Sequence, residues 1–530
     1  MKTAVLEKYA WHPWVFAIYY VVFPYIINIQ HLPIQSIVKP LFIILLGTSI
    51  FFLLLLLIFK KTDLAAIFTS ITLILFFSYP PVFSIIQVIA LLTGSNEGIF
   101  EKTLQISKIW IFIPLLIIIL GGITIPKKDP KFTRLLKIAL NAASLLLLVI
   151  NCCYAIIKIN DSRSTWTFEK NWKTTIKEVT DQKIKLIQPQ RDIYLIVLDA
   201  YGSRQVLQEL YQFDNSHFEN ELIKLGFQII PNGRTNYNQT RTSFSSMLNM
   251  QYLDEISSAV GGQTTDAHPL INMIQNNRVS ALLHSAGYTI INFPSGYEYT
   301  EDIQADYQIK GEVYLDNFAQ TLIWNSAAYP FLHRKLYDWH RENITSAIDG
   351  LADLSAYPSP KFVIAHIFAP HPPFVFDKDG NELIPNYQFT AIDADTLRNN
   401  TSTEYYKAQY TEQLEYISNS ILQTIQDILD DSTTQPIIIL CGDHGPAMTV
   451  SLTNVYGTEQ YERVHILDAL YLPGVAADQV LADHTPVNTF RIILNNYFGE
   501  DLPLLENRTY VSSYDTPYHF VEIPGSNGDQ

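Results

Sequence analysis

Five apolar runs in the first 160 residues constrain the fold of this chain more than any other feature. Each run approaches or exceeds the length of about 20 residues that a helix needs to cross a bilayer. A buried helix of a soluble domain could imitate one such run, but not five in succession. The sequence therefore predicts a membrane domain of five helices, at 14–29, 41–59, 64–92, 109–125 and 138–159.

Basic residues on alternate loops indicate the orientation of this domain. Lys60 and Lys61 follow the second run, and five more cluster between the fourth and fifth runs: Lys127, Lys128, Lys131, Arg134 and Lys137. Loops that carry such clusters stay on the cytoplasmic side. We therefore expect a multi-pass protein of the cytoplasmic membrane, with its N-terminus in the cytoplasm and its C-terminal domain outside. No small-residue cleavage site follows the first run, so we expect it to be retained.

The remaining chain divides into a short connection and a large domain. Residues 161–190 alternate aromatic and basic side chains, including Trp166, Lys170 and Trp172. This pattern is typical of a juxtamembrane linker near the lipid headgroups, and a solvated helix fits it equally well. The domain boundaries are accordingly predicted as 1–160 for the transmembrane domain, 161–190 for the linker and 191–530 for the extracytoplasmic domain.

Charge separates the two parts of the chain. Residues 1–160 contain 13 Lys and Arg against 5 Asp and Glu, whereas residues 161–530 contain 23 against 46. Nucleic-acid partners are excluded for so acidic a domain, because binding them depends on Lys and Arg that neutralise phosphates. An acidic domain is compatible with recruitment of divalent cations. Residues 191–530 contain only Cys441, so this domain has no internal disulfide.

The C-terminal domain has the alternating pattern of an α/β fold. Residues 193–198 are aliphatic or aromatic throughout, as in a parallel strand buried on both faces. Further strands are predicted at 227–230, 288–293, 361–368 and 436–440, and helices at 216–225, 266–286 and 404–429. Such alternation predicts a doubly wound sheet that binds ligands beyond the carboxyl ends of its strands.

Two acidic positions directly follow predicted strands. Asp199 follows 193–198, and Asp443 with His444 lies between Gly442 and Gly445 after 436–440. Carboxylate and imidazole groups on a glycine-flanked turn form a compact metal site. For Asp199 alone, a helix cap is an equal alternative. For the second motif, the alternative is a polar turn without a metal.

Hydroxyl groups gather where a turn enters a predicted helix, at 236–243. Thr240, Thr242 and Ser243 lie there, and free backbone N–H groups at a helix start favour an anion or a developing alkoxide. The segment is therefore a candidate nucleophile position, although an ordinary cap is the commoner role of such residues. His366 and His371, five residues apart at the end of 361–368, could reach the same cleft as substrate contacts, proton donors or a second metal site.

With these motifs in order, the chain resembles the sulfatase-like branch of the alkaline phosphatase superfamily, especially membrane-anchored lipoteichoic acid synthases and phosphoethanolamine transferases. The resemblance covers the architecture, while residue matches are confined to the motifs. It implies a divalent cation, Zn or Mn before Mg or Ca, held by four residues: Asp199, Thr240, Asp443 and His444. It selects Thr240 as the nucleophile, because the family nucleophile is often followed at the third position by a serine, here Ser243.

The same resemblance suggests roles for four further residues. The pair His366 and His371 matches the His-x4-His motif of the transferases, so His371 is expected to protonate the leaving group. Arg463 matches the segment after the Asp-His pair and is expected to hold the substrate anion. Weaker substrate contacts are expected for His366 and Ser243.

The implied reaction is transfer of a phospho-group from a phosphodiester lipid donor, through a covalent intermediate on Thr240, to an envelope glycan or lipid. Segment 240–244 has Thr240 at the position of the convertible Cys or Ser of true sulfatases and lacks their proline, which disfavours sulfate-ester hydrolysis. The alternatives are hydrolysis of an ester by water and a non-catalytic module in envelope assembly. Transport is disfavoured, because no apolar run carries paired charges.

Overall fold

The computed structural model describes residues 3–92, 99–124, 130–181, 184, 189–231, 233–302, 304–312, 315–385, 387, 389, 397–398, 401–451, 455–457, 459–476, 480 and 484–524. The chain forms two compact units. The first comprises Met1–Asp161, Leu315–Leu336 and Asn386–Gln388, and the second comprises Ser162–Tyr314, Tyr337–Pro385 and Phe389–Gln530.

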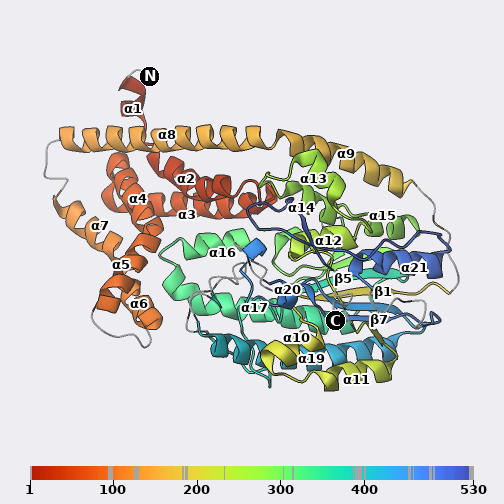
Figure 1. Ribbon diagram of the computed structural model, residues 1–530. Helices are drawn as coiled ribbons and strands as arrows, with labels where there is room; N and C mark the ends of the chain where they lie inside the picture. Colours follow the sequence, from red (N-terminus) through yellow and green to blue (C-terminus); the bar gives the residue numbers. More distant parts are fainter. Residues whose placement is uncertain are drawn as a thin grey trace. The chain divides into compact units, whose positions relative to one another are not determined.

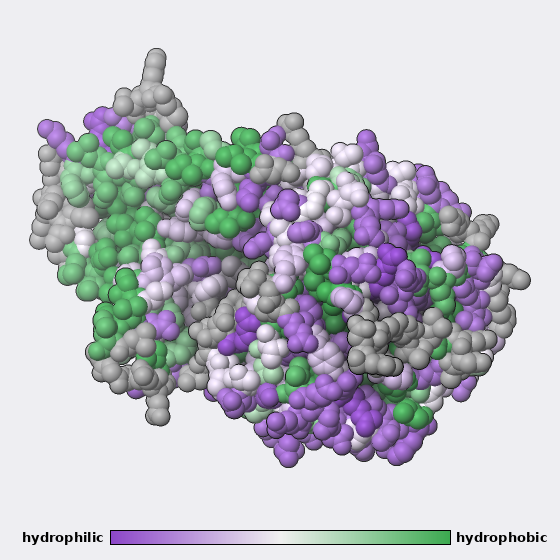
Figure 2. Space-filling model, in the orientation of Figure 1, coloured by the Kyte–Doolittle hydropathy of each residue, from purple (hydrophilic) through white to green (hydrophobic). Residues whose placement is uncertain are grey.

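The first unit consists of helices (Figure 1), and many of their apolar side chains are exposed. Leu57 is 74% exposed and Phe42 66% exposed, values that only a lipid environment makes favourable for such side chains. Figure 2 shows hydrophobic residues gathered over this part of the chain. Its helices are α1 (Thr3–Lys8), α2 (His12–Ile27), α3 (Gln35–Phe59), α4 (Thr62–Phe77), α5 (Tyr79–Leu92), α6 (Ile99–Ser107), η1 (Lys108–Ile111), α7 (Phe112–Thr124), α8 (Pro130–Asp161) and α16 (Asn317–Trp324).

Three stretches of the described chain are long and apolar enough to span a membrane: Gln35–Phe59, Ile99–Gly122 and Pro130–Asn160. A fourth possible span is the pair Thr62–Phe77 and Tyr79–Ala90, which is bent by 49°. This bend lies beside Pro80 and Pro81 in the third predicted run, as expected where proline interrupts a helix. The predicted count of five therefore depends on α2, which is apolar but only 16 residues long.

Polar contacts join helices in this unit. Lys137 Nζ of α8 lies 3.0 Å from Asp63 Oδ2 of α4. His12 Nδ1 lies 2.5 Å from the Ser70 hydroxyl, and Asn141 accepts a hydrogen bond from the His12 backbone N–H. Asp63 and Lys137 lie next to the predicted apolar runs, not within them. This ion pair is therefore positioned to join α4 and α8 near the surface of the membrane.

The second unit is built on a seven-stranded mixed sheet, as the α/β prediction requires. Its strand order is β2-β7-β6-β1-β5-β3-β4. The central strands are parallel, and β7 pairs antiparallel with β6 and with β2. The strands are β1 (Ile193–Leu198), β2 (Gln228–Ile229), β3 (Thr289–Phe293), β4 (Tyr307–Gln308), β5 (Lys361–Ile367), β6 (Ile437–Gly442) and β7 (Asp468–Tyr471); β8 (Thr509–Val511) and β9 (Val521–Ile523) form a separate pair.

Helices cover both faces of this sheet, with α12, α15 and α21 over one face and α11 and α19 over the other (Figure 1). Alternate residues of β1, including Leu195 and Val197, enter the same core as Phe244 and Phe490. All six residues of β1 are buried, which explains its unbroken apolar sequence. The helices are α9 (Arg163–Thr180), α10 (Arg204–Tyr211), α11 (Ser216–Leu225), α12 (Thr240–Met247), α13 (Asp254–Val260), α14 (His268–Gln275), α15 (Arg278–Ser285), η3 (Glu298–Thr300), α17 (Tyr329–Ala352), which starts in the first unit, α19 (Thr403–Asp431), η4 (Val455–Gly457), α20 (Tyr461–Val464), η6 (Pro486–Asn488) and α21 (Thr489–Phe498).

The predicted strands and helices all have counterparts in this unit, although one predicted helix is divided and the structure adds elements that were not predicted, such as β7, α17 and α21. The helix predicted over 266–286 is two helices, α14 and α15, because Asn277 starts a new helix by accepting a hydrogen bond from Ser280 N. Strand β7 was not predicted, since four residues in an antiparallel position give little periodic signal. The remaining predicted strands fall on β1, β2, β3, β5 and β6.

The segment predicted as a linker is largely an ordered helix. Helix α9 packs within the second unit, where Trp172 is buried and donates a hydrogen bond to the Asn276 carbonyl. Thr165 donates to Asp266 Oδ2 over 2.6 Å. Trp166 is 52% exposed, so the aromatic residues of this segment divide between the core and the surface.

Candidate active site

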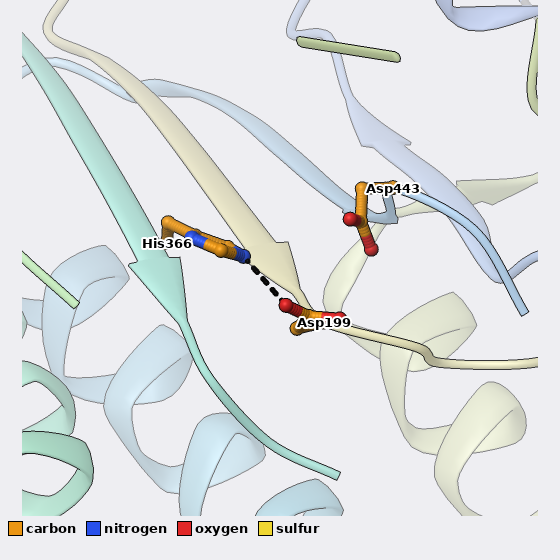
Figure 3. A group of neighbouring side chains, drawn as sticks. All are labelled: Asp199, His366 and Asp443. Atoms are coloured by element: carbon orange, nitrogen blue, oxygen red, sulfur yellow. Dashed lines mark hydrogen bonds and ion pairs between the residues drawn. The ribbon is translucent and has the colours of Figure 1, made fainter. Parts of the chain in front are cut away.

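Three parallel strands end together at the candidate site. Leu198, the last residue of β1, is level with the last residues of β5 and β6. Asp199 follows β1, Asp443 follows β6, and His366 is the next-to-last residue of β5. Figure 3 shows these side chains turned toward one another, although distant parts of the sequence supply them.

These three side chains form a group able to hold a metal ion. One possible ligand atom from each lies within 4.8 Å of the others, and all three residues are buried. His366 Nε2 is 3.1 Å from Asp199 Oδ2 (Figure 3). Asp199 Oδ1 and Asp443 Oδ2 are buried and have no hydrogen-bond partner among the described residues. Buried carboxylate oxygens without a donor are costly unless a cation compensates them.

Electrostatics support the same interpretation. Burial and the nearby charge of Asp199 raise the pKa of Asp443 to about 7. Burial also raises the pKa of Asp199, opposed by the charges of His371 and Arg463. Two carboxyl groups that resist ionisation side by side would be stabilised as carboxylates by a divalent cation.

His444 and Thr240 complete the group that the sequence predicted as metal ligands. His444 Nε2 lies 3.0 Å from Thr240 Oγ1, 3.2 Å from Asp443 Oδ2 and 3.7 Å from Asp199 Oδ1. His444 Nδ1 lies 3.0 Å from the Gly445 carbonyl, which can only accept, so Nδ1 carries the proton. Nε2 then carries no proton, and its lone pair faces carboxylate oxygens. Such an arrangement of acceptors fits a cation between them.

The backbone fixes these side chains in place. Asp443 Oδ1 accepts hydrogen bonds from Ala200 N and His444 N, which leaves Oδ2 toward the site. Ala200 has a φ of 62°, an unusual conformation for a residue with a side chain. Thr240 is the first residue of α12, where helix-start N–H groups favour negative charge on its oxygen.

His366, expected as a substrate contact or as part of a second metal site, lies beside the two carboxylates. It lies within the carboxylate group, and its Nδ1 is 2.8 Å from Thr300 Oγ1 and 3.2 Å from Ser295 Oγ. Burial lowers the pKa of His366 to about 4, which keeps the ring neutral and available as a ligand. The two hydroxyl residues, which follow β3, were not singled out from the sequence, because isolated serines and threonines in a loop carry no signal.

His371 lies beside Asp199. Its backbone N–H donates to the Asp199 carbonyl over 3.0 Å, and its Nδ1 lies 2.5 Å from the Pro372 carbonyl. The ring is buried and packs against Phe368 at 4.7 Å between ring centroids. Burial lowers the pKa of His371, while the charge of Asp199 raises it. With Nδ1 donating to a carbonyl, Nε2 is the nitrogen available for proton transfer.

Arg463 and Ser243 take part in positioning contacts. Arg463 is fully buried, and it donates from Nε to the Asn238 carbonyl and from Nη1 to the Gly445 carbonyl, each over 2.9 Å. It thereby joins the Thr240 loop to the Asp-His turn. Ser243 Oγ is 3.1 Å from Thr235 Oγ1, which in turn donates to the Asp443 carbonyl.

Aromatic residues surround this polar group. The Tyr297 ring lies 6.4 Å from that of His366 and 5.9 Å from that of Phe368. Arg241, next to Thr240, is buried with its guanidinium 5.5 Å from the Tyr299 ring and 5.3 Å from the Tyr514 ring. These tyrosines lie outside every predicted motif, because isolated tyrosines in loops carry no spacing signal.

Comparison with known proteins gives structural likeness at low sequence identity. No protein-family model matches the chain, and no curated protein matches it. The periplasmic domain of EptC from Escherichia coli, in complex with Zn, is 12% identical, has a TM-score of 0.41, and aligns over 64% of this chain and 96% of that chain. The integral membrane lipooligosaccharide phosphoethanolamine transferase A from Neisseria meningitidis is 11% identical, with a TM-score of 0.39 over 92% and 95%. A putative sulfatase from Bacteroides thetaiotaomicron is 12% identical, with a TM-score of 0.39 over 62% and 75%.

Proposed function

We propose that this chain is a membrane-anchored, metal-dependent, sulfatase-like enzyme that cleaves a phosphodiester through a covalent phosphothreonine intermediate. The observation that carries the proposal is the convergence of Thr240, His444 and two buried carboxylates around one point. A hydroxyl group at a helix start, beside a cation site, is the arrangement of an activated nucleophile.

Four residues would hold the cation: Asp199, Asp443, His444 and Thr240. His366 is a further ligand candidate, because its Nε2 lies beside Asp199. The mixture of carboxylate and imidazole donors favours Zn or Mn, with Mg or Ca as the alternatives. When bound, the cation would lower the pKa of the Thr240 hydroxyl and offset negative charge on the phosphate.

The chain's own residues supply the chemical steps. Thr240 Oγ1 loses its proton to water and attacks the phosphorus atom, forming an Oγ1–P bond while the P–O bond to the leaving group breaks. His371 acts in its imidazolium form, with a proton on each ring nitrogen, and transfers the Nε2 proton to the leaving oxygen. An acceptor hydroxyl group then attacks the phosphothreonine, breaks the Oγ1–P bond and gives its proton to His371. The departing Thr240 oxygen takes back a proton from water, which regenerates the hydroxyl group.

Arg463 acts in this scheme by holding the Thr240 loop and the Asp-His turn together. Its Nε and Nη1 are committed to two backbone carbonyls. A direct contact with the substrate anion would therefore come from Nη2 or from the second N–H of Nη1.

The acceptor decides between transferase and hydrolase. A sugar or lipid hydroxyl would make the chain a transferase in cell-envelope modification, and water would make it a phosphodiesterase. The apolar helices of the first unit favour a membrane lipid as donor, since they hold the protein in the layer where such lipids reside. The acidic second unit would face away from the cytoplasm, because the basic loops belong inside.

Intact-mass and metal measurements test the proposal. The full chain in detergent is incubated with vesicles of bacterial phospholipid extract or with a chromogenic phosphodiester, and its mass and bound metal are then measured. We expect a divalent cation and a phosphoryl-containing adduct on Thr240, whose mass identifies the transferred group. Metal-free, unmodified protein that leaves both substrates intact would favour a non-catalytic module in envelope assembly.

A further inference from the structure

Helix α19 places two polar side chains, one turn apart, against the loops of the candidate site. Gln413 contacts the segment that carries His371, and Tyr410 contacts the segment that follows Asp199. Both residues are fully buried. Neither belongs to a motif that suggested function, because isolated polar residues within a long helix usually face solvent.

All hydrogen-bonding capacity of the Gln413 amide is used on one segment. Its Oε1 accepts from Val375 N over 2.7 Å and from Phe376 N over 3.3 Å. Its Nε2 donates to the Pro370 carbonyl over 3.3 Å and to the His371 carbonyl over 3.2 Å. Two acceptor sites and two donors are the full capacity of a glutamine amide. The alternation of donors and acceptors also fixes which end of the amide is nitrogen.

The sequence of this segment explains why it needs such a partner. Pro370, Pro372 and Pro373 have no backbone N–H, so the segment cannot continue β5 as a regular ladder. Its buried carbonyl and N–H groups would then lack partners, and Gln413 satisfies four of them. The position of the His371 backbone is thus set by a side chain of α19.

Tyr410 acts in the same way on the neighbouring loop. Its hydroxyl donates to the Ala200 carbonyl over 2.8 Å and accepts from Gly202 N over 3.3 Å. Ala200 has the strained φ of 62°, and it directly follows Asp199. Side chains of α19 therefore hold both the loop that follows Asp199 and the segment that carries His371.

We propose that Gln413 is a positioning residue that holds His371 where it can protonate the leaving group. This inference rests on the proposed function, in which His371 gives its Nε2 proton to the departing oxygen. It predicts that Gln413 matters only for substrates whose leaving group needs that proton. Tyr410, which holds the Asp199 loop instead, should matter for every substrate.

The test compares two leaving groups on the full chain in detergent with added Zn or Mn. A p-nitrophenyl phosphodiester releases an acidic phenol that departs without a proton, whereas phospholipid vesicles supply a poor alcohol leaving group. The Gln413→Glu variant keeps the acceptors but removes the two donors. We expect its kcat on phospholipid to fall by about 10- to 100-fold, with KM nearly unchanged and the nitrophenyl rate within about threefold of wild type.

Two other variants act as controls. Thr424→Val, on the same helix, removes hydroxyl contacts to Ile348 and Ser420 away from the site and should change neither rate. Tyr410→Phe should slow both substrates equally and weaken metal binding. Equal loss of both rates in Gln413→Glu, or loss of neither, would overturn the role of Gln413.

Should Gln413→Glu fail to fold, Gln413→Asn is measured in wild-type and His371→Ala backgrounds. The proposal requires that the substitution slow phospholipid cleavage in the first background and have no further effect in the second. An additive effect would contradict it. If wild type itself cleaves neither substrate, the proposed function fails and this inference fails with it, an outcome distinct from a wild type that is active and insensitive to Gln413.

Discussion

Thr240 Oγ1 lies 3.0 Å from His444 Nε2, although 204 residues separate them in the sequence. The contact depends on two loops at the carboxyl edge of the sheet, one entering α12 and the other leaving β6. Arg463 joins these loops through the carbonyls of Asn238 and Gly445. The nucleophile candidate and the metal-ligand candidates are therefore held in place before any ligand arrives, as catalysis by preorganisation requires.

Thr240→Ala should abolish turnover while leaving the fold intact. The substitution removes the attacking oxygen, so we expect a loss of at least about 10³-fold in kcat and no phosphoryl adduct by intact mass. Thr242→Ala is the matched control. Thr242 lies two residues after Thr240 in the same helix, and its hydroxyl group donates to the Gln239 carbonyl. An active Thr240→Ala protein would refute the covalent mechanism.

Arg463→Lys should reduce activity strongly, although the substitution keeps the positive charge. A lysine ammonium is a single point donor and cannot replace two guanidinium nitrogens that reach different carbonyls. We expect kcat to fall by about 10- to 100-fold. Arg491→Lys provides the control, since Arg491 also bridges backbone carbonyls, at Met250 and Pro503, but away from the site. Equal effects of the two substitutions on activity would contradict a specific role for Arg463.

Removal of the metal should destabilise the second unit. Chelation leaves Asp199 and Asp443 buried side by side, whereas Zn or Mn bound only by the folded state raises stability with ligand concentration. We expect Tm to fall with EDTA and to recover when metal is added back. The readout is thermal unfolding of the full chain in detergent.

Asp443→Asn should stabilise the metal-free protein and weaken its response to metal. The amide removes one of the two carboxylates, so the metal-free variant should be more stable than metal-free wild type by about 1–3 kcal/mol. It should also lose most of the rise in Tm on addition of metal. Wild-type and variant proteins that respond equally to metal would show that Asp443 is not a ligand.

The strands that carry the site could be predicted because each is a largely apolar run of residues in the sequence. Residues 193–198 are a continuous apolar run, and the structure forms β1 over the same residues. Asp199 and Asp443 were identified because each follows such a strand, and parallel strands end at a common edge. The expectation that the two acidic residues share one metal came from the resemblance to the superfamily, and the structure brings their side chains together.

The role of His366 could not be predicted in the same way. It lies inside an apolar run, so its pattern is that of a core residue. Its position depends on the register that pairs Val197 with His366, and hydrophobic periodicity does not encode register between strands far apart in sequence. Gln413 could not be identified for the same reason, because its hydrogen-bond partners lie about 40 residues away along the chain.

The buried carboxyl group of Asp468 makes stability depend on pH. Asp468 lies on β7, is 1% exposed, and its Oδ2 has no hydrogen-bond partner among the described residues. The nearest imidazole nitrogen, His484 Nε2, is 3.8 Å away. Burial raises the pKa of Asp468 to about 8, compared with about 4 in an unfolded chain.

The sign of the effect follows from proton binding. Below about pH 4 both states hold the proton, and between about pH 4 and pH 8 only the folded state does, so the free energy of unfolding falls as pH rises through this range. Asp468→Asn removes the titration. We expect the variant to be about 1–3 kcal/mol more stable than wild type at pH 8 and nearly equal at pH 5.

Thermal unfolding at the two pH values, with metal held constant, measures this difference. Asp192→Asn is a useful contrast, because Asp192 pairs with the buried ammonium group of Lys361 at 2.8 Å. Its loss leaves that charge without a carboxylate and should lower Tm at both pH values. A loss of stability from Asp468→Asn at both pH 5 and pH 8 would mean that the carboxyl group is already ionised in the folded protein, held as an ion pair with His484.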